Sequence, residues 1–219
     1  MNKNMIKKIF KSKSSQGFTM LELLLAASMS SIVLTGAGWA LLQMMQASAK
    51  SEDQSLARLE LNRALDFIAN EIKMAEIINT IQAPEDNTVV LLNIPILNPE
   101  NNTDKYVRYF IESANAGSVW QGPKVIKRYG PPINIDGTYS DNTWQTDTLI
   151  DFISDEVVTP ECPSGLNNIY PKGVKQGFYT CVDGNQKIAK IFIQGVDRDG
   201  NSISTVESMV YARSSSTSP

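Results

Sequence analysis

Residues 17–45 read GFTMLELLLAASMSSIVLTGAGWALLQMM, an apolar run that opens on a glycine and carries a single carboxylate near its start. Residues 1–16 hold five lysines and no acidic residue. A helix of about 20 apolar residues, each rising about 1.5 Å, spans the hydrocarbon core of a bilayer. The 28 residues of 18–45 are therefore long enough to cross a membrane. The lysines predict a cytoplasmic N-terminus, with the chain beyond the run exported.

Glu22 is the unusual residue of this run. A carboxylate inside such a segment costs roughly 2.5–3.5 kcal/mol to insert, so an intramembrane acidic residue suggests a function. The alternative is that Glu22 lies in the first helical turn near the membrane interface, where its charge favours the helix dipole. The residue alone does not separate these two interpretations.

The pattern Gly17-Phe18-Thr19-x-x-Glu22 ahead of a long apolar run resembles the class III signal of type IV pilins and type II secretion pseudopilins. The resemblance is close over residues 12–45. It implies that a prepilin peptidase cuts after Gly17, that Phe18 is then N-methylated, and that Glu22 acts in assembly. One position departs from the family pattern, because Trp39 stands where many major pilins carry a proline.

Two rival interpretations use the same residues. A conventional secretory signal has an apolar region of about 7–15 residues followed by an A-x-A cleavage site, and residues 47–49 supply such a site. The apolar run here is about twice that length and contains Glu22, which disfavours this interpretation. The second rival is a plain signal anchor that is not cut.

Composition narrows the class of protein further. Removing residues 1–17 leaves 15 basic against 23 acidic residues, a net charge of −8, and a nucleic-acid-binding surface is normally basic. The chain contains no histidine, which excludes histidine-based triads and histidine metal sites. The carboxylates Asp151, Asp155 and Glu156 have no accompanying nucleophile–base set, so we expect neither an enzyme nor a resident cofactor.

Residues 46–83 continue the helix as an amphipathic segment, with apolar residues at the three- and four-residue spacing of one helical face. Pro84 is expected to end it, because the residue before a proline is disfavoured in the α region. Residues 61–72 resemble the second helical half of PilW-type minor pilins and J-type pseudopilins. The opposite face is expected to be solvated, and its residues are Arg58, Glu60, Asn62, Arg63, Asp66, Asn70, Glu71 and Lys73.

Residues 84–213 predict a β-rich head, followed by a flexible tail over 214–219. Enrichment in β-branched and aromatic residues between turn signals indicates an antiparallel meander packed on the helix, and Asp183-Gly184 is a hairpin signal. Residues 130–147 are expected to form a loop. The predicted strands are 88–94, 106–111, 124–129, 178–182, 187–194 and 206–212.

Cys162 and Cys181 are the two cysteines of the chain, and in an exported segment they predict one disulfide that closes a loop with little core of its own. Asp197, Asp199 and Asn201 form a weak calcium candidate, because calcium takes oxygen ligands from closely spaced carboxylates and carbonyls. The pattern lacks a distal glutamate, and a plain β-turn is the favoured interpretation.

The sequence therefore predicts an α+β fold: a long N-terminal helix, transmembrane then amphipathic, packed on an antiparallel β-rich head. The resemblance implies a minor pilin or pseudopilin, a single-pass inner-membrane protein with its N-terminus in the cytoplasm, which later enters a pilus or pseudopilus. The implied partners are prepilin peptidase, other pilins or pseudopilins and the inner-membrane assembly platform. A similarity to the cyanobacterial pseudopilins linked to hormogonium polysaccharide secretion is less specific.

An alternative is that the head is a tip-located adhesin or substrate-capture module. The loops 130–147 and 163–177 would form its surface. An exposed aromatic group made of Trp120, Trp144 and Tyr170 would support this alternative, whereas buried rings would weaken it.

Overall fold

The computed structural model describes residues 17–78, 87–94, 97, 106–115, 117–140 and 143–213. Residues 1–16 of the predicted leader 1–17, the segment 79–83 and the tail 214–219 lie outside the described residues. The chain divides into two compact units, Met1–Lys50 and Ser51–Pro219.

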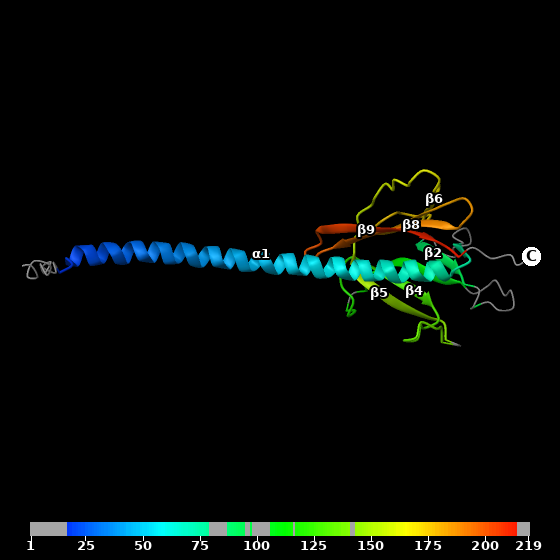
Figure 1. Ribbon diagram of the computed structural model, residues 1–219, viewed down its shortest axis with the longest axis horizontal. Helices are drawn as coiled ribbons and strands as arrows, with labels where there is room; N and C mark the ends of the chain where they lie inside the picture. The colour runs from blue at the N-terminus through cyan, green and yellow to red at the C-terminus, as the bar shows by residue number, and fades with distance from the viewer. Residues whose placement is uncertain are drawn as a thin grey trace, which may run out of the picture. The chain divides into compact units, whose positions relative to one another are not determined.

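One long helix, α1 (Met20–Met74), runs through both units (Figure 1). It ends at Met74 and not near residue 82, so the predicted helical segment extended too far. The reason is strand pairing: Ile77–Ile78 forms strand β1, with Ile77 opposite Asn93 and Ile78 opposite Leu92. Backbone hydrogen bonds to a neighbouring strand replace those of a further helical turn, ahead of the proline that was expected to end the helix.

The second unit contains an antiparallel nine-stranded sheet that curls into a half-barrel. Its order is β1-β2-β3-β4-β5-β8-β7-β6, with β9 paired to β8. Strands β2 to β4 form the predicted meander and β5 extends it, and β8 joins β5 through one residue pair, Ile153 with Gly195. The other strands are β2 (Thr88–Asn93), β3 (Val107–Ser113), β4 (Lys124–Gly130), β5 (Gln145–Ile153), β6 (Asn168–Tyr170), β7 (Phe178–Val182), β8 (Ile188–Val196) and β9 (Ser202–Tyr211).

The six predicted strands all have an observed counterpart, and the last begins earlier than expected, at Ser202. The hairpin at Asp183-Gly184 is confirmed, since β7 pairs with β8. Its positive φ angle falls on Gln186, at 60°, and the Asp183 carboxylate accepts hydrogen bonds from the backbone of the turn. Three strands were not expected from the sequence: the short strands β1 and β6, whose two or three residues carry too little periodicity to detect, and β5, which begins at Gln145 inside the predicted loop 130–147 and pairs with β4.

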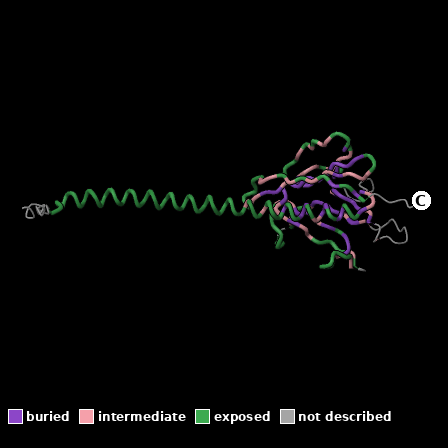
Figure 2. Tube along the Cα trace, in the orientation of Figure 1, coloured by how far each residue is buried: buried purple, intermediate pink, exposed green. Residues whose placement is uncertain are grey.

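The core lies between the last turns of α1 and the inner face of the sheet (Figure 2). Helix residues at the predicted spacing are buried, from Leu61 through Ile68 to Ile72. Gly195 allows the close approach of helix and sheet, because a Cβ atom there would lie 2.6 Å from Cδ1 of Leu61. On the other side, the Thr180 hydroxyl donates to the Val89 carbonyl at 2.8 Å and so ties β7 to β2.

The prediction that Glu71 lies on the solvated face of the helix was wrong, because this residue is only 1% exposed. Arg128, on β4, grips the carboxylate with two hydrogen bonds, Nη2 to Oε1 at 2.6 Å and Nε to Oε2 at 3.0 Å. The hydroxyl of Tyr139 donates to Oε1 at 3.0 Å, and that of Tyr109 donates to Oε2. These four residues, here called the Glu71 cluster, join the helix to β3, β4 and the β4–β5 loop.

The pKa values of the side chains around Glu71 are shifted by burial and by the charge of its carboxylate. Burial, and then the Glu71 charge, raise the pKa of Tyr109 and of Tyr139 well above the ordinary value, so both phenols remain neutral donors. Burial alone would lower the pKa of Arg128, but the hydrogen bonds and charge of Glu71 raise it. A buried charge pair of this kind persists only when it is fully hydrogen-bonded, and Arg128 Nη1 also donates to the Pro131 carbonyl at 2.9 Å.

Cys162 and Cys181 form the predicted disulfide, with their Cα atoms 5.8 Å apart. The bond joins the segment before β6 to β7, over a small second core that contains Leu166 and Phe192. Few apolar residues hold this segment, so the cross-link supplies much of its restraint.

Replacing Cys162 with serine should lower the free energy of unfolding of the head by about 2–5 kcal/mol, because the open chain gains conformational freedom. Urea titration of the mature chain in detergent measures this. The parent chain in excess reductant is the matched control and should lose the same amount. An unchanged unfolding midpoint in both samples would contradict a stabilising role for the bond.

Candidate functional site

The start of α1 carries the sequence motif of the chain. Gly17 is exposed, and a Cβ atom added there would have no neighbour within 4 Å, so the Gly17–Phe18 bond is open to an approaching enzyme. Phe18 is also exposed, at 83% of its full area. The predicted cleavage and methylation atoms are thus presented on an accessible segment immediately before the helix.

Thr19 and Glu22 form a reciprocal cap at this helix start. The Glu22 amide donates to the Thr19 hydroxyl at 3.3 Å, and the Thr19 amide and hydroxyl lie 3.4 and 3.3 Å from Glu22 Oε2. This is the capping-box arrangement, in which each residue satisfies a backbone donor of the other. The helix-start interpretation of Glu22 therefore has direct geometric support. The carboxylate stays exposed, so it can also reach a second charged group.

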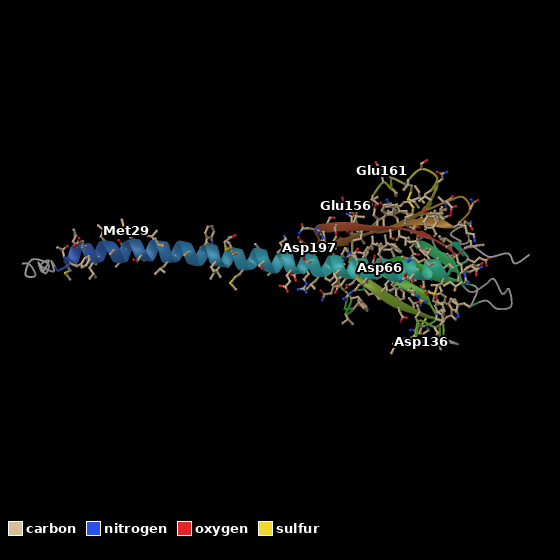
Figure 3. The ribbon with its side chains drawn as sticks, viewed as in Figure 1. Met29, Asp66, Asp136, Glu156, Glu161 and Asp197 are labelled. Atoms are coloured by element: carbon tan, nitrogen blue, oxygen red, sulfur yellow. A yellow bond between two sulfur atoms is a disulfide. The ribbon has the colours of Figure 1, made fainter. Side chains whose placement is uncertain are left out.

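The apolar run of residues 18–45 has the side chains of a helix that lies in lipid or among other apolar helices. Every residue of 18–45 is exposed in the isolated chain, as the outward-pointing Met29 illustrates (Figure 3). Three of its hydroxyls are bonded within the helix: those of Ser28, Ser31 and Thr35 donate to carbonyls three or four residues earlier, at 2.7–2.9 Å. Polar groups paired in this way reduce the cost of burial in lipid or among other helices. By length and composition, α1 can cross a membrane.

The carboxylates considered from the sequence do not converge. Asp151 accepts a hydrogen bond from the Gln121 amide at 2.8 Å, while Asp155 and Glu156 are exposed. Asp197 Oδ1 accepts from the backbone amides of Asp199 and Asn201, at 3.0 and 2.8 Å, which closes the β8–β9 turn. Over the described residues, no group of three or more acidic, cysteine or histidine side chains is placed to hold a metal ion. A calcium site at this turn stays a prediction.

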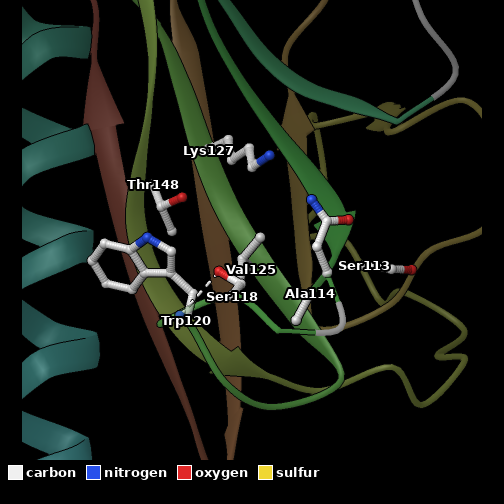
Figure 4. A pocket seen from close by; sticks show the side chains of 8 residues that line it. Ser113, Ala114, Ser118, Trp120, Val125, Lys127 and Thr148 are labelled. Atoms are coloured by element: carbon white, nitrogen blue, oxygen red, sulfur yellow. Dashed lines mark hydrogen bonds between the residues drawn. The ribbon is translucent and has the colours of Figure 1, made fainter.

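The three aromatic residues proposed for an adhesive surface are not brought together as an exposed group. Tyr170 is 1% exposed, and Trp144 is half-buried against the core and Tyr129, with ring centroids 5.5 Å apart. Trp120 is 44% exposed and lies beside Thr148 at the rim of a small cavity of about 60 Å³ (Figure 4).

Three of the polar side chains that line this cavity, those of Ser113, Ser118 and Lys127, have partners within the head. Lys127 pairs with Glu112 at 2.5 Å, and the Ser118 hydroxyl accepts from the Trp120 amide at 3.1 Å. The cavity is floored by the buried Val125. These contacts connect the β3–β4 loop to the strands beside it. They do not indicate a ligand for the cavity.

A comparison with protein families matches residues 12–38 to the prokaryotic N-terminal methylation motif, which is typical of type IV pilins and pseudopilins. No curated protein and no solved structure matches the chain. The motif supports a pilin-like or pseudopilin subunit and points to a structural role rather than an enzyme. Together with the single apolar helix, it is consistent with membrane anchoring.

Proposed function

We propose that the chain is a minor pilin or pseudopilin, a structural subunit of a type IV pilus or a type II secretion-like filament. Prepilin peptidase cuts it between Gly17 and Phe18, and Phe18 is then N-methylated. Before assembly it is a single-pass protein of the inner membrane, with a cytoplasmic N-terminus and an exported head. The assembly platform then transfers it into the filament, where neighbouring subunits cover residues 18–45.

The observation that carries this proposal is the methylation motif at residues 12–38, which overlaps the exposed apolar start of α1, a helix that continues to Met74 in the head. Cutting at a secretory site after Ala49 would discard the apolar run and divide α1, which is continuous from Met20 to Met74 and contributes core residues from Leu61 onward. Cleavage at Gly17 keeps the apolar helix attached to the head, as a filament subunit requires. The long head, the two-cysteine loop and the resemblance of residues 61–72 to PilW-type minor pilins and J-type pseudopilins favour a low-copy tip or priming subunit.

Replacing Glu22 with leucine should leave membrane insertion and cleavage intact but strongly reduce entry into the filament. The physical reason is a charge pair between Glu22 and the free amine of Phe18 on a neighbouring subunit. Opposite charges about 4 Å apart attract by about 4 kcal/mol at an effective dielectric of 20, less the cost of desolvation. The measurement is the ratio of filament-associated to membrane-retained chain, which should fall about tenfold.

Two further variants separate the charge of Glu22 from its capping hydrogen bonds. Glu22→Gln keeps a capping-box side chain and removes the charge, so it should be as defective as the leucine variant. Thr19→Ala removes the reciprocal cap and keeps the carboxylate, so it should assemble nearly as well as the parent. If Thr19→Ala fails and Glu22→Gln assembles, Glu22 acts through the helix start and the charge pair is refuted.

A further inference from the structure

Residues 132–140, between β4 and β5, form a small ordered hairpin, here called the 132–140 hairpin. Its arms are joined by the Ser140 amide donating to the Pro132 carbonyl at 2.8 Å and by a bridge between Ile133 and Tyr139. Nearer the tip, the Asn134 amide donates to the Thr138 carbonyl at 2.8 Å. This segment was expected to be a loop from its composition, yet its own backbone hydrogen bonds give it a defined shape.

Both arms of the hairpin are attached to the interior of the head. The Tyr139 hydroxyl reaches the buried Glu71 carboxylate at 3.0 Å, and the Pro131 carbonyl accepts from Arg128 at 2.9 Å. The hairpin is therefore fixed to helix α1 and strand β4 at its base. A segment ordered in advance loses little conformational entropy when it binds another molecule.

The tip of the hairpin presents an apolar side chain beside a negative charge. Ile135 is fully exposed, at 110% of its reference area, and Asp136 lies at the projecting end of the loop (Figure 3). Asn134 to Gly137 form a turn closed at 2.9 Å, with the last residue at φ 83°. Ile135 occupies the first of its two central positions, where the commonest type of turn accepts most residues.

Single exposed apolar residues are common on protein surfaces and need no explanation by themselves. The tip differs because a β-branched apolar residue occupies a turn that two attachments hold rigid. The hydrogen bonds from the hydroxyl and amide of Thr138 lower the pKa of Asp136, so its carboxylate is charged.

We propose that the 132–140 hairpin is a docking element for another protein. Ile135 enters an apolar pocket on that partner, and Asp136 pairs with a lysine or arginine at the rim of the pocket. Tyr139 is a positioning residue that fixes the hairpin through Glu71. The proposal concerns the head alone and does not depend on whether the chain enters a filament.

The charge of the chain selects the class of partner. Residues 18–219 carry a net charge of −8, and one of these acidic residues, Asp136, lies at the contact itself. A second copy would bring two acidic surfaces together, and an anionic lipid surface would repel the tip. A different protein with a basic rim around an apolar pocket is the occupant that fits both features.

The test is site-specific photocrosslinking from position 135 of the full-length chain in membranes of the producing cells. The control carries the same photoreactive side chain at Val174, which is 61% exposed on the disulfide-closed segment. Position 135 should give one discrete product with another protein, and mass spectrometry of the product identifies the contact surface. The yield should exceed that at position 174 by about tenfold.

Second-site changes decide whether the captured contact is the proposed one. Asp136→Lys should reduce the yield by about tenfold, and exchanging the mapped basic residue of the partner for glutamate should restore it. Tyr139→Phe should reduce the yield more than Tyr109→Phe, which also removes a hydroxyl donor to Glu71 but lies outside the hairpin. A product containing two copies of this chain, adducts to lipid alone, or a yield insensitive to Asp136→Lys would each overturn the proposal.

Discussion

Replacing Gly17 with aspartate should abolish processing, so that the chain accumulates at its full length with all 17 leader residues attached. Aspartate places a larger, charged side chain at the scissile bond, where the proposed peptidase requires a small residue. Gly17 has open space around it in the structure, so the variant should fold and insert as the parent does. Terminal sequencing and intact mass of the membrane-bound chain give the result directly.

The parent chain supplies the decisive comparison for this experiment. Its mature N-terminus should be Phe18, carrying a methyl group. Gly17→Ala is the matched control, because alanine is small and uncharged, and it should still be processed. A parent chain that begins after Ala49 would identify an ordinary secretory signal, and normal cutting of Gly17→Asp after residue 17 would contradict a prepilin-type site.

Arg128→Leu should lower the free energy of unfolding of the head by about 3–5 kcal/mol, the usual cost of leaving one partner of a buried pair uncompensated. The Glu71 carboxylate would remain buried with only the hydroxyls of Tyr109 and Tyr139 as donors. Glu71→Leu should cost a similar amount, because it leaves a buried guanidinium with the Pro131 carbonyl as its acceptor. Urea titration in detergent, followed by tryptophan fluorescence, measures both.

The double variant Glu71→Leu/Arg128→Leu isolates the interaction between the two side chains. It removes both charges, so it should cost far less than the sum of the single changes. Lys127→Met is the matched control on the same strand, because its pair with Glu112 is partly exposed and such pairs contribute about 0–1 kcal/mol. Additive costs of the two single variants would show that Glu71 and Arg128 do not interact. An Arg128→Leu cost no larger than that of Lys127→Met would show that the buried pair does not stabilise the head.

Much of the fold could be predicted because it is encoded locally. The apolar run of 18–45, the helical spacing from Leu61 to Ile72 and the β-rich runs each carry their signal in neighbouring residues. The same is true of the candidate site, since Gly17, Phe18 and Glu22 lie within six residues. A cap such as Thr19 with Glu22 also depends only on residues three apart.

A charged residue such as Glu71 is usually solvated, so its residue type predicts an exposed side chain, whereas its position on the helix predicts a buried one. Glu71 lies three residues after Ile68, inside the apolar stripe of the helix, and Arg128 lies two residues after Ile126 on the inner face of β4. Both positions were recognisable as buried from periodicity. That the two charges compensate each other could not be inferred, because 57 residues separate them and only the folded sheet brings them together.

The sequence by itself determined the processing motif, the membrane-length helix, the meander of β2 to β4, the hairpin at Asp183-Gly184 and the pairing of the two cysteines. Each of these depends on a short-range pattern or, for the cysteines, leaves a single choice of partner. The tertiary structure alone decided where α1 ends, since pairing of Ile77–Ile78 with β2 outweighs helix continuation. It also decided that Glu71 is buried and that Tyr139 holds a hairpin on the helix. These features depend on contacts between distant residues, whose desolvation and hydrogen bonding exist only once helix and sheet have packed.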